Sequence, residues 1–208
     1  MFITFEGGEG SGKTTQIRLL QTFLQQRGIA SVLTREPGGT VGAEEIRALL
    51  LRGDTDRWDA LSELFLFSAA RRDHLTRVIW PALKKGETVI CDRFADSTLV
   101  YQGYCSKTPE RSMAQIQAIY KMLAGDFQPD LTVILDIDVK TGLARSIARA
   151  GNDEQRFERK AVDFHETVRS AFLDIAEKNP ARCVVINADD SKESIHAQIV
   201  QAVLARIK

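Results

Sequence analysis

A glycine-rich segment near the start of the chain constrains the fold more than any other part of the sequence. Residues 7–14 read Gly-Gly-Glu-Gly-Ser-Gly-Lys-Thr, after an apolar run at residues 2–5 and before a helical pattern that begins near Thr15. The order is therefore strand, loop and helix. These spacings of glycine, lysine and hydroxyl, in this context, are typical of a phosphate-binding P-loop. A glycine-rich turn without a ligand is the alternative for shorter matches, and the full pattern favours the phosphate site.

Each residue type in this segment has a physical role in holding a phosphate. The backbone N–H groups must surround the anion, and glycine permits backbone angles and a close approach that side chains would block. The helix that begins near Lys13 directs its positive end at the same phosphates. We expect Lys13 to reach the β- and γ-phosphates and the Thr14 hydroxyl to contact Mg²⁺. The predicted nucleotide-binding residues are Gly7, Gly8, Glu9, Gly10, Ser11, Gly12, Lys13, Thr14 and Thr15.

Short apolar runs alternate with longer helical patterns along the chain. The expected strands are residues 2–6, 30–35, 88–92, 131–136 and 182–187. Helical spacing places Ile17, Leu20 and Leu24 on one face of the first helix and Ile195, Ile199, Val203 and Ile207 on one face of the last. The strands are nearly continuously apolar, as in strands covered on both faces. We therefore expect an α/β fold of the P-loop NTPase type, a three-layer sandwich in which helices flank a five-stranded parallel sheet.

Composition narrows the class of protein. The 208 residues predict one enzyme-sized domain over 1–208, since no linker divides the chain. The formal net charge of zero argues against a nucleic acid polymer as partner. The three cysteines have no CxxC spacing, so free thiols in a reducing cytosol are expected. With no basic leader before the first strand and no apolar run of bilayer length, we expect a cytoplasmic protein without a membrane partner.

Polar residues follow the second expected strand, at the edge where ligands of parallel sheets collect. Residues 34–40 read Thr-Arg-Glu-Pro-Gly-Gly-Thr, a turn in which Thr40 can cap the next helix. Arg35 is a candidate phosphate ligand, and the alternative is a surface ion pair of Arg35 with Glu36. Arg47, on the following helix, is expected near the mouth of the same crevice.

Asp92 and Arg93 end the third expected strand. An acidic residue at the end of a buried strand beside the P-loop strand suits a Walker-B role, in which it orders Mg²⁺ directly or through water. Arg93 can clamp phosphate oxygens in bidentate fashion. The alternative is a salt bridge between the two neighbours.

The helical region 58–86 holds Phe67 and Arg71, which lie four residues apart and therefore on one face. A flat aromatic ring beside a planar guanidinium suits a nucleobase. The alternative is a core phenylalanine covered by an arginine stem. Residues 97–103 add hydrogen-bonding side chains, and Thr98 and Tyr101 can face a pocket together. His74 and His165 have no nearby metal-ligand or triad partners by spacing and are not expected to be catalytic.

A lid is expected after the fourth strand. Asp138 is a candidate N-cap for a helix that contains Arg145 and Arg149. The lid itself is predicted at about residues 150–159, which are polar, interrupted by glycine and rich in arginine. A charged, solvated face is the alternative. Beside a nucleotide site, a positive segment that closes over the triphosphate is favoured.

Several features favour a kinase that phosphorylates a phosphate. The arginines are spread over strand ends and a lid, enough for two anionic ligands. A nucleoside monophosphate has a second pKa of about 6 and is largely dianionic at neutral pH, so the transfer needs no general base. Phosphoryl transfer depends mainly on alignment and charge neutralisation, which Lys13, Mg²⁺ and arginines can supply.

Several blocks taken together resemble bacterial thymidylate kinase, a P-loop nucleoside monophosphate kinase family. They are residues 5–15, 34–40, 67–71, 92–94 and 97–103. The match runs in order from the first strand into the last helices. The resemblance implies transfer of the ATP γ-phosphoryl group to dTMP, giving dTDP and ADP, with Mg²⁺. It also implies a homodimer formed through long helices, for which the apolar stretch 61–67 is a candidate.

The resemblance also implies roles for single residues. Phe67 would stack on thymine, Arg71 would bond its exocyclic oxygen and Thr98 would help to read the base edge. Glu9 would contact the sugar 3′-hydroxyl, and Tyr101 would crowd the 2′ position. The acceptor nucleotide, chiefly its phosphate, would be held by Arg35, Arg47, Arg93 and Gln102. Thr14 and Asp92 would bind the metal.

One position divides the family. Some members carry an arginine in the P-loop just after the acidic residue, where this chain has Gly10. Members without it take catalytic arginines from the lid, and the candidates here are Arg149 and Arg156, with Arg145 and Arg159 possible. The chain has Gln155 before Arg156, where the commoner pair is Asp-Arg.

Two other functions have to be weighed against the sequence. Another nucleoside monophosphate kinase, of the dUMP, CMP or AMP type, is disfavoured because Arg71 offers donors where cytosine or adenine presents an amino group. A nucleotide-switch binding protein would be expected to carry an Asn-Lys-x-Asp segment, and the sequence has none.

Overall fold

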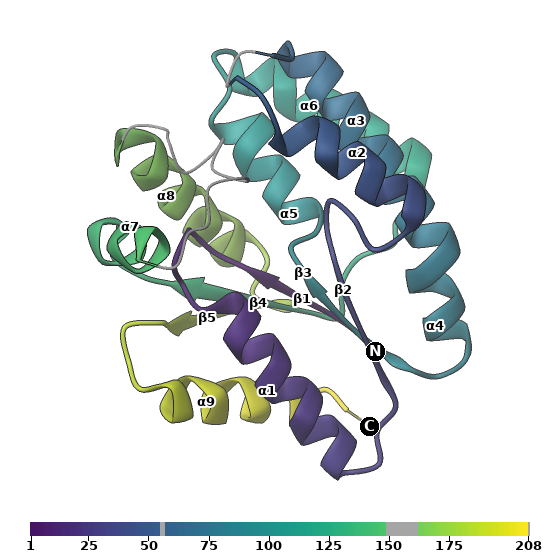
Figure 1. Cartoon of the computed structure of the whole chain (residues 1–208), viewed down its shortest axis with the longest axis vertical. Coiled ribbons are helices and arrows are strands. Elements are labelled where there is room, and N and C mark those ends of the chain that lie inside the picture. Colours follow the sequence, from purple (N-terminus) through teal and green to yellow (C-terminus); the bar gives the residue numbers. More distant parts are fainter. Residues whose placement is uncertain (55–56, 149–161, 208) are drawn as a thin grey trace.

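A parallel sheet of five strands runs through the middle of the molecule (Figure 1). The structure is a computed structural model that describes residues 1–54, 57–148 and 162–207. The strands are β1 (Phe2–Glu6), β2 (Ser31–Arg35), β3 (Thr88–Asp92), β4 (Leu131–Asp136) and β5 (Cys183–Asn187), in the order β2-β3-β1-β4-β5. All neighbours pair in parallel. The predicted fold class is confirmed, and β2 and β5 each begin one residue later than expected.

Helices connect these strands. They are α1 (Lys13–Gln26), α2 (Val41–Leu51), α3 (Ala60–His74), α4 (Trp80–Lys84), α5 (Ala95–Thr98), α6 (Pro109–Ala124), α7 (Val139–Ile147), α8 (Val162–Lys178) and α9 (Lys192–Leu204), with π-helical turns η1 (Leu75–Ile79) and η2 (Leu99–Tyr104). The helical region expected over 58–86 appears as α3, η1 and α4 in direct succession. No helix in the described ranges is long and apolar enough to cross a membrane.

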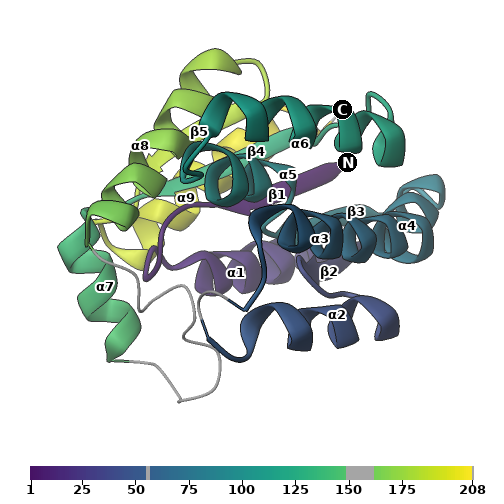
Figure 2. The same ribbon diagram turned by 90° about the horizontal axis from the view of Figure 1, so that it is seen from above.

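Helices cover both faces of the sheet (Figure 1, Figure 2). In Figure 1, α1 and α9 lie below the sheet, while α3, α5, α6 and α8 lie above it. The lower layer buries the side chains expected from the helical pattern, namely Ile17, Leu20, Leu24, Ile195, Ile199 and Val203. Helix α9 ends at Leu204, so the placement of Ile207 in this helix was wrong. Ile207 packs against the same cluster from beyond the helix.

An aromatic anchor fixes the chain where it leaves β3. The ring of Phe94 is buried and lies edge-on to Phe2 of β1, with 4.9 Å between the ring centroids. Phe94 belongs to a buried cluster that η1 and α4 complete. Because Phe94 is fixed in the core, the backbone of the preceding residue, Arg93, is fixed as well.

Charged residues end three neighbouring strands at one edge of the sheet. Asp92 of β3 is in register with Phe5 of β1 and with Arg35 of β2. Glu6 ends β1 directly before the P-loop. Because the strands are parallel, these carboxyl ends meet at the edge where α/β proteins bind ligands.

Candidate active site

The P-loop packs so closely that some of its positions accept only glycine. A Cβ atom at Gly10 would lie 1.9 Å from the carbonyl oxygen of Gly142, and the φ of Gly10 is 67°. A Cβ atom at Gly7 would lie 2.4 Å from the carbonyl oxygen of Leu135, at a φ of 132°. These glycines therefore seat the loop against β4 and α7, in addition to leaving its N–H groups open to a ligand.

Lys13 is buried within the curve of this loop. Its Nζ atom donates to the carbonyl oxygens of Gly7 and Gly8, each at 2.9 Å. Burial, and next the charge of Arg93, lower the pKa of Lys13 to about 8, although Glu9 acts in the opposite direction. The ammonium form still predominates at pH 7, so the P-loop holds a positive charge over its own backbone.

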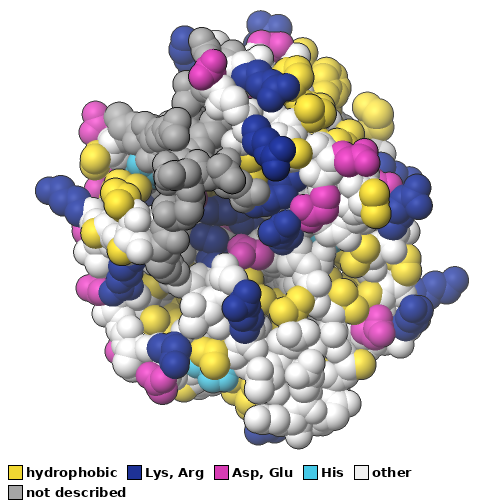
Figure 3. Space-filling model, in the orientation of Figure 1, with side chains coloured by type: hydrophobic (Ala, Val, Ile, Leu, Met, Phe, Trp, Pro, Cys, Tyr) yellow, Lys and Arg dark blue, Asp and Glu magenta, His cyan; other side chains and the backbone are white. Residues whose placement is uncertain are grey.

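A cleft of about 490 Å³ lies over the P-loop. Three arginines from separate elements line it: Arg35 from the end of β2, Arg47 from α2 and Arg93 from beyond β3. Figure 3 shows basic side chains gathered in a hollow at the centre of this face. The lining also includes Glu9, Gly10, Ser11, Gly12, Lys13, Thr14, Glu36, Asp92 and Ser146. Ser146 of α7 was not singled out from the sequence, because a lone serine on a helix gives no signal.

Arg93 is held in the cleft by its backbone conformation and by two hydrogen bonds. It has a φ of 67° and is the one non-glycine residue with a positive φ in the part of the chain that the structure describes. Its Nη2 atom donates to Oε1 of Glu9 at 3.0 Å, and Nη1 donates to the carbonyl oxygen of Gly7 at 3.2 Å. Burial works to raise the pKa of Glu9, but the charges of Arg93 and Lys13 outweigh it and lower that pKa. Glu9 is therefore ionised beside the P-loop.

The alternative of a salt bridge between Asp92 and Arg93 is wrong, because Arg93 pairs with Glu9. Asp92 instead accepts a hydrogen bond at 3.3 Å from the hydroxyl of Thr14. Within the described ranges no group of three or more His, Cys, Asp or Glu side chains is suited to a metal. Mg²⁺ at nucleotide sites needs only one or two protein oxygens besides water and phosphate. The Thr14 hydroxyl and the Asp92 carboxylate fit that requirement.

Glu6 is a buried carboxyl that the sequence analysis did not single out. It is fully buried, and its Oε1 atom accepts from the backbone N–H groups of Phe94 at 2.8 Å and Ser97 at 3.2 Å. Its Oε2 atom bonds the Ser97 hydroxyl at 2.6 Å. Glu6 thus ties the end of the P-loop strand to the turn that carries Arg93. Burial, and next the charge of Asp96, raise the pKa of Glu6 to about 7.

The pKa of Glu6 predicts a pH-dependent stability. Its ordinary pKa is 4.5 and its folded pKa is about 7, so between these pH values the folded protein holds a proton that the unfolded chain releases. The free energy of unfolding should therefore fall as pH rises through this window, by on the order of 3 kcal/mol. Glu6→Gln should lose this part of the slope when denaturant unfolding is measured at pH 4.5 and at pH 7.5. Glu44→Gln is the control, because the pKa of Glu44 is lowered. Parallel stability curves for wild type and Glu6→Gln would rule the assignment out.

The predicted base-reading residues lie on α3 and α5. Nη2 of Arg71 donates to the Thr98 hydroxyl at 2.9 Å, and both residues are buried. The guanidinium of Arg71 lies 5.2 Å from the ring centroid of Phe94. Phe67, on the same helix as Arg71, is half-buried.

Tyr101 and Gln102 occupy different surroundings on η2. The Tyr101 ring lies 5.3 Å from Cζ of Arg93, and it packs near Phe172 with 6.5 Å between ring centroids. Gln102 donates from Nε2 to Oε1 of Glu63 at 2.9 Å. It is not among the described residues that line the cleft. Tyr101 is likewise absent from this lining, so the structure places Tyr101 beside Arg93, behind the cleft surface, and Gln102 against α3.

The predicted lid lies outside the described residues. Arg149, Arg156 and Arg159, and the lid at 150–159, belong to this segment. Arg145 on α7 is described, and it bonds the carbonyl oxygen of Ala188 at 3.0 Å and Oδ1 of Asp189 at 2.8 Å. Asp138 caps α7 as expected.

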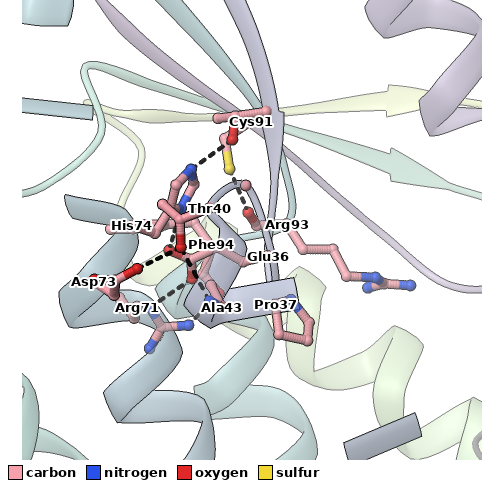
Figure 4. Close-up of polar contacts among 12 residues, drawn as sticks. Glu36, Pro37, Thr40, Ala43, Arg71, Asp73, His74, Cys91, Arg93 and Phe94 are labelled. Carbon is pink, nitrogen blue, oxygen red and sulfur yellow. Dashed lines mark hydrogen bonds and ion pairs between the residues drawn. The ribbon is translucent and has the colours of Figure 1, made fainter. Parts of the chain in front are cut away.

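The alternative of an ion pair between Arg35 and Glu36 is wrong. Arg35 pairs with Glu44 at 2.9 Å, while Glu36 turns inward and is buried. Glu36 accepts from Arg71 Nε at 2.7 Å and from His74 Nδ1 at 3.0 Å (Figure 4). His74 thus has a buried hydrogen-bond partner that the sequence did not indicate. Spacing along the chain carried no signal for it, because Glu36 and His74 meet only in the fold.

The chain is similar to known proteins over nearly its whole length. The sequence model of the thymidylate kinase family, "Thymidylate kinase", matches residues 5–199. The thymidylate kinase of Caulobacter vibrioides is 48% identical over 206 residues, which are 99% of this chain and 97% of the relative. The thymidylate kinase of Ruegeria pomeroyi is 47% identical over 207 residues, covering 100% of this chain and 96% of the relative.

A solved structure has the same fold. The crystal structure of thymidylate kinase from Ehrlichia chaffeensis superposes with a TM-score of 0.78 and 37% sequence identity. The superposition covers 98% of each chain.

Proposed function

The chain belongs to the thymidylate kinase family, and we propose that its cleft transfers the γ-phosphoryl group of ATP to dTMP, giving dTDP and ADP. One observation carries the assignment of the site. Arg35, Arg47 and Arg93 converge from separate elements on a cleft that also contains the P-loop. Such a cleft can hold two phosphate-bearing ligands beside each other, which in-line transfer requires.

The ATP phosphates would lie on the P-loop. Its backbone N–H groups, with the N-terminus of α1, would surround them, and Lys13 would neutralise charge on the transferred group. This part of the site comprises Gly7, Gly8, Glu9, Gly10, Ser11, Gly12, Lys13, Thr14 and Thr15. Thr14 and Asp92 would hold Mg²⁺, which supplies positive charge to the phosphates.

The dTMP acceptor would lie on the arginine side of the cleft. Arg35, Arg47 and Arg93 would hold its phosphate, together with Gln102 once that side chain leaves Glu63. The phosphate is largely dianionic at neutral pH, so no side chain has to remove a proton before attack. Arg93 would also act on the transferred group, and Arg149 and Arg156 of the lid would join it.

The sugar and base would lie between η2 and α3. Glu9 would accept from the 3′-hydroxyl, and its ionised state suits this role. Tyr101, packed beside Arg93, would crowd the 2′ position and favour deoxyribose. Phe67 would stack on thymine, while Arg71 and Thr98 would read the base edge.

We also propose that the 208 residues form one kinase domain and that the chain works as a homodimer in the cytoplasm. Apolar side chains on α2 and α3 support the dimer, since Leu49, Leu61 and Phe65 are 41%, 40% and 55% exposed. Hydrophobic side chains also gather at the upper edge of the face drawn in Figure 3. Cys91, Cys105 and Cys183 are free thiols, as a reducing compartment requires.

A steady-state assay tests the reaction class. ADP formation from ATP should require both dTMP and Mg²⁺, and excess EDTA should abolish it until Mg²⁺ is restored. ATP hydrolysis that is independent of any acceptor would point to a nucleotide-switch protein and against a kinase.

A further inference from the structure

A line of hydrogen-bonded polar side chains, all buried except the half-buried Thr34, runs from the end of β2 to α5. Thr34 lies in β2 and Glu36 directly after it, and Arg71 and His74 lie on α3. Figure 4 shows Glu36 between Arg71 and His74. Arg71 and His74 are three residues apart, so both face the sheet edge. The line is Thr34 Oγ1 to His74 Nε2 at 2.5 Å, His74 Nδ1 to Glu36 at 3.0 Å and Glu36 to Arg71 Nε at 2.7 Å.

The donors of Arg71 are divided among fixed partners. Nε donates to Glu36, and Nη2 donates to the Phe94 carbonyl oxygen at 3.1 Å and to the Thr98 hydroxyl at 2.9 Å. Among the described residues, none accepts a hydrogen bond from Nη1. A planar guanidinium held at two of its nitrogens has a fixed orientation, so the direction of Nη1 is fixed as well.

Glu36 carries the charge that makes this orientation possible. Its side chain and that of Arg71 are each 4% exposed, so each ion is costly to bury without the other. Both oxygens of Glu36 are used, one by Arg71 and the other by His74. A carboxylate only accepts hydrogen bonds, so Nδ1 of His74 must be the donor. His74 is fully buried and is held from its other side by Thr34.

We propose that Glu36 and His74 are positioning residues that fix the guanidinium of Arg71, and that this fixed guanidinium discriminates a 4-oxo pyrimidine from a 4-amino pyrimidine. The proposal rests on the proposed function, in which Arg71 donates to the exocyclic oxygen of thymine. A mobile guanidinium could turn away from the 4-amino group of cytosine. A fixed guanidinium instead directs its N–H donor at that amino group, which is also a donor, so no hydrogen bond can form. Glu36 and His74 thus act on the base only through Arg71.

Glu36→Gln is the first test. The amide keeps the volume but removes the charge, and it cannot accept from both Arg71 and His74. The kcat/KM for dTMP should fall by about ten- to a hundredfold, the range that follows from losing a hydrogen bond to a charged group. The kcat/KM for dUMP, which has the same 4-oxo edge, should fall in parallel, while that for dCMP should not. The loss should lie in the KM for dTMP, with the KM for ATP unchanged.

Two His74 variants test the hydrogen bond from His74 to Glu36 separately. The amide nitrogen of His74→Asn can take the place of Nδ1 and keep the donor to Glu36. The amide nitrogen of His74→Gln takes the place of Nε2 and loses that donor. The ratio of kcat/KM for dTMP over dCMP should therefore be kept in His74→Asn and should fall in His74→Gln. These two His74 variants test the positioning role even if Glu36→Gln does not fold.

Asp73→Asn is the matched control. Asp73 is on the same helix and accepts from Thr40 and Arg77, without bonding to Arg71. It should change thermal stability but leave the dTMP-to-dCMP ratio at its wild-type value. The proposal is overturned if Glu36→Gln lowers the kcat/KM for dTMP, dUMP and dCMP equally. It is also overturned if His74→Asn and His74→Gln have the same dTMP-to-dCMP ratio of kcat/KM. A wild-type chain without dTMP kinase activity would contradict the proposed function instead.

Discussion

Replacing Lys13 with methionine should lower kcat by about a hundred- to a thousandfold, the loss seen when one fixed donor to a developing charge is removed. Nζ of Lys13 is held at 2.9 Å from two loop carbonyl oxygens, so its charge is in place before ATP arrives. Such a preorganised charge does not have to be reoriented during transfer. Methionine keeps much of the buried stem and removes only the charge and its donors.

The control for this variant is Lys85→Met, which removes a lysine that is exposed at the end of α4. Lys85→Met should have wild-type kcat. For Lys13→Met, steady-state kinetics and thermal unfolding should show a folded protein whose main defect is in kcat. A variant that keeps wild-type kcat and shows only a raised KM for ATP would mean that Lys13 binds the ground state and does not act on the transferred group.

Replacing Arg93 with methionine should be at least as damaging, with kcat/KM for dTMP lowered by about 10³-fold or more, as for arginines that act on transferred phosphoryl groups. Two causes add up. The cleft loses a guanidinium that is held between Glu9 and the Gly7 carbonyl oxygen. Glu9 also loses its ion-pair partner and leaves a negative charge where the dianionic acceptor must bind.

A double-mutant cycle separates the two causes. Glu9→Gln alone should weaken dTMP binding through the sugar, but in the Arg93→Met background it should restore part of the lost activity. The two changes should therefore be strongly non-additive, as expected for side chains in direct contact. Arg93→Lys should recover little, because an ammonium cannot reproduce the planar fork. Additive losses in kcat/KM would show that the Glu9–Arg93 pair is not a functional unit.

The sheet and the P-loop were predictable because their signals are local. Five apolar runs of strand length alternate with helical patterns, and each run became a strand of the sheet within one residue of its expected bounds. The loop residues adjoin one another in sequence, so their spacing specifies their geometry. The meeting of Arg35 and Arg93 followed from one rule, that the carboxyl ends of parallel strands share an edge.

The pairing of charges was not predictable, because it depends on contacts between distant segments. Both ion pairs inferred between neighbours in the sequence, Arg35 with Glu36 and Asp92 with Arg93, were wrong. The actual partners are Glu44 for Arg35, and Glu9, which lies 84 residues away, for Arg93. A single sequence does not show which of many carboxylates will face a given arginine.

Buried polar residues gave the weakest signals of all. Glu6 ends an apolar strand and resembles any solvated residue at a strand end, yet it is fully buried and organises the turn after β3. His74 lies in a helix with no ligand pattern around it. Only the fold brings it to Glu36, which itself stands before a proline in what reads as a surface turn.

The most direct test of the central claim is a competition among acceptors in one reaction. Equimolar dTMP, dUMP, dCMP, dAMP and dGMP are incubated with a limiting amount of Mg-ATP, and the diphosphate products are separated and quantified. The initial ratios of the products equal the ratios of kcat/KM for the acceptors. Because all acceptors share one enzyme sample, differences in enzyme concentration cannot affect these ratios. A thymidylate kinase whose base is read by Arg71 and Thr98 should form dTDP in large excess over the diphosphates of dCMP, dAMP and dGMP, whereas dUMP, which has the same 4-oxo edge, is expected to compete more strongly than these three. Predominance of another diphosphate, or an equal mixture, would contradict the account.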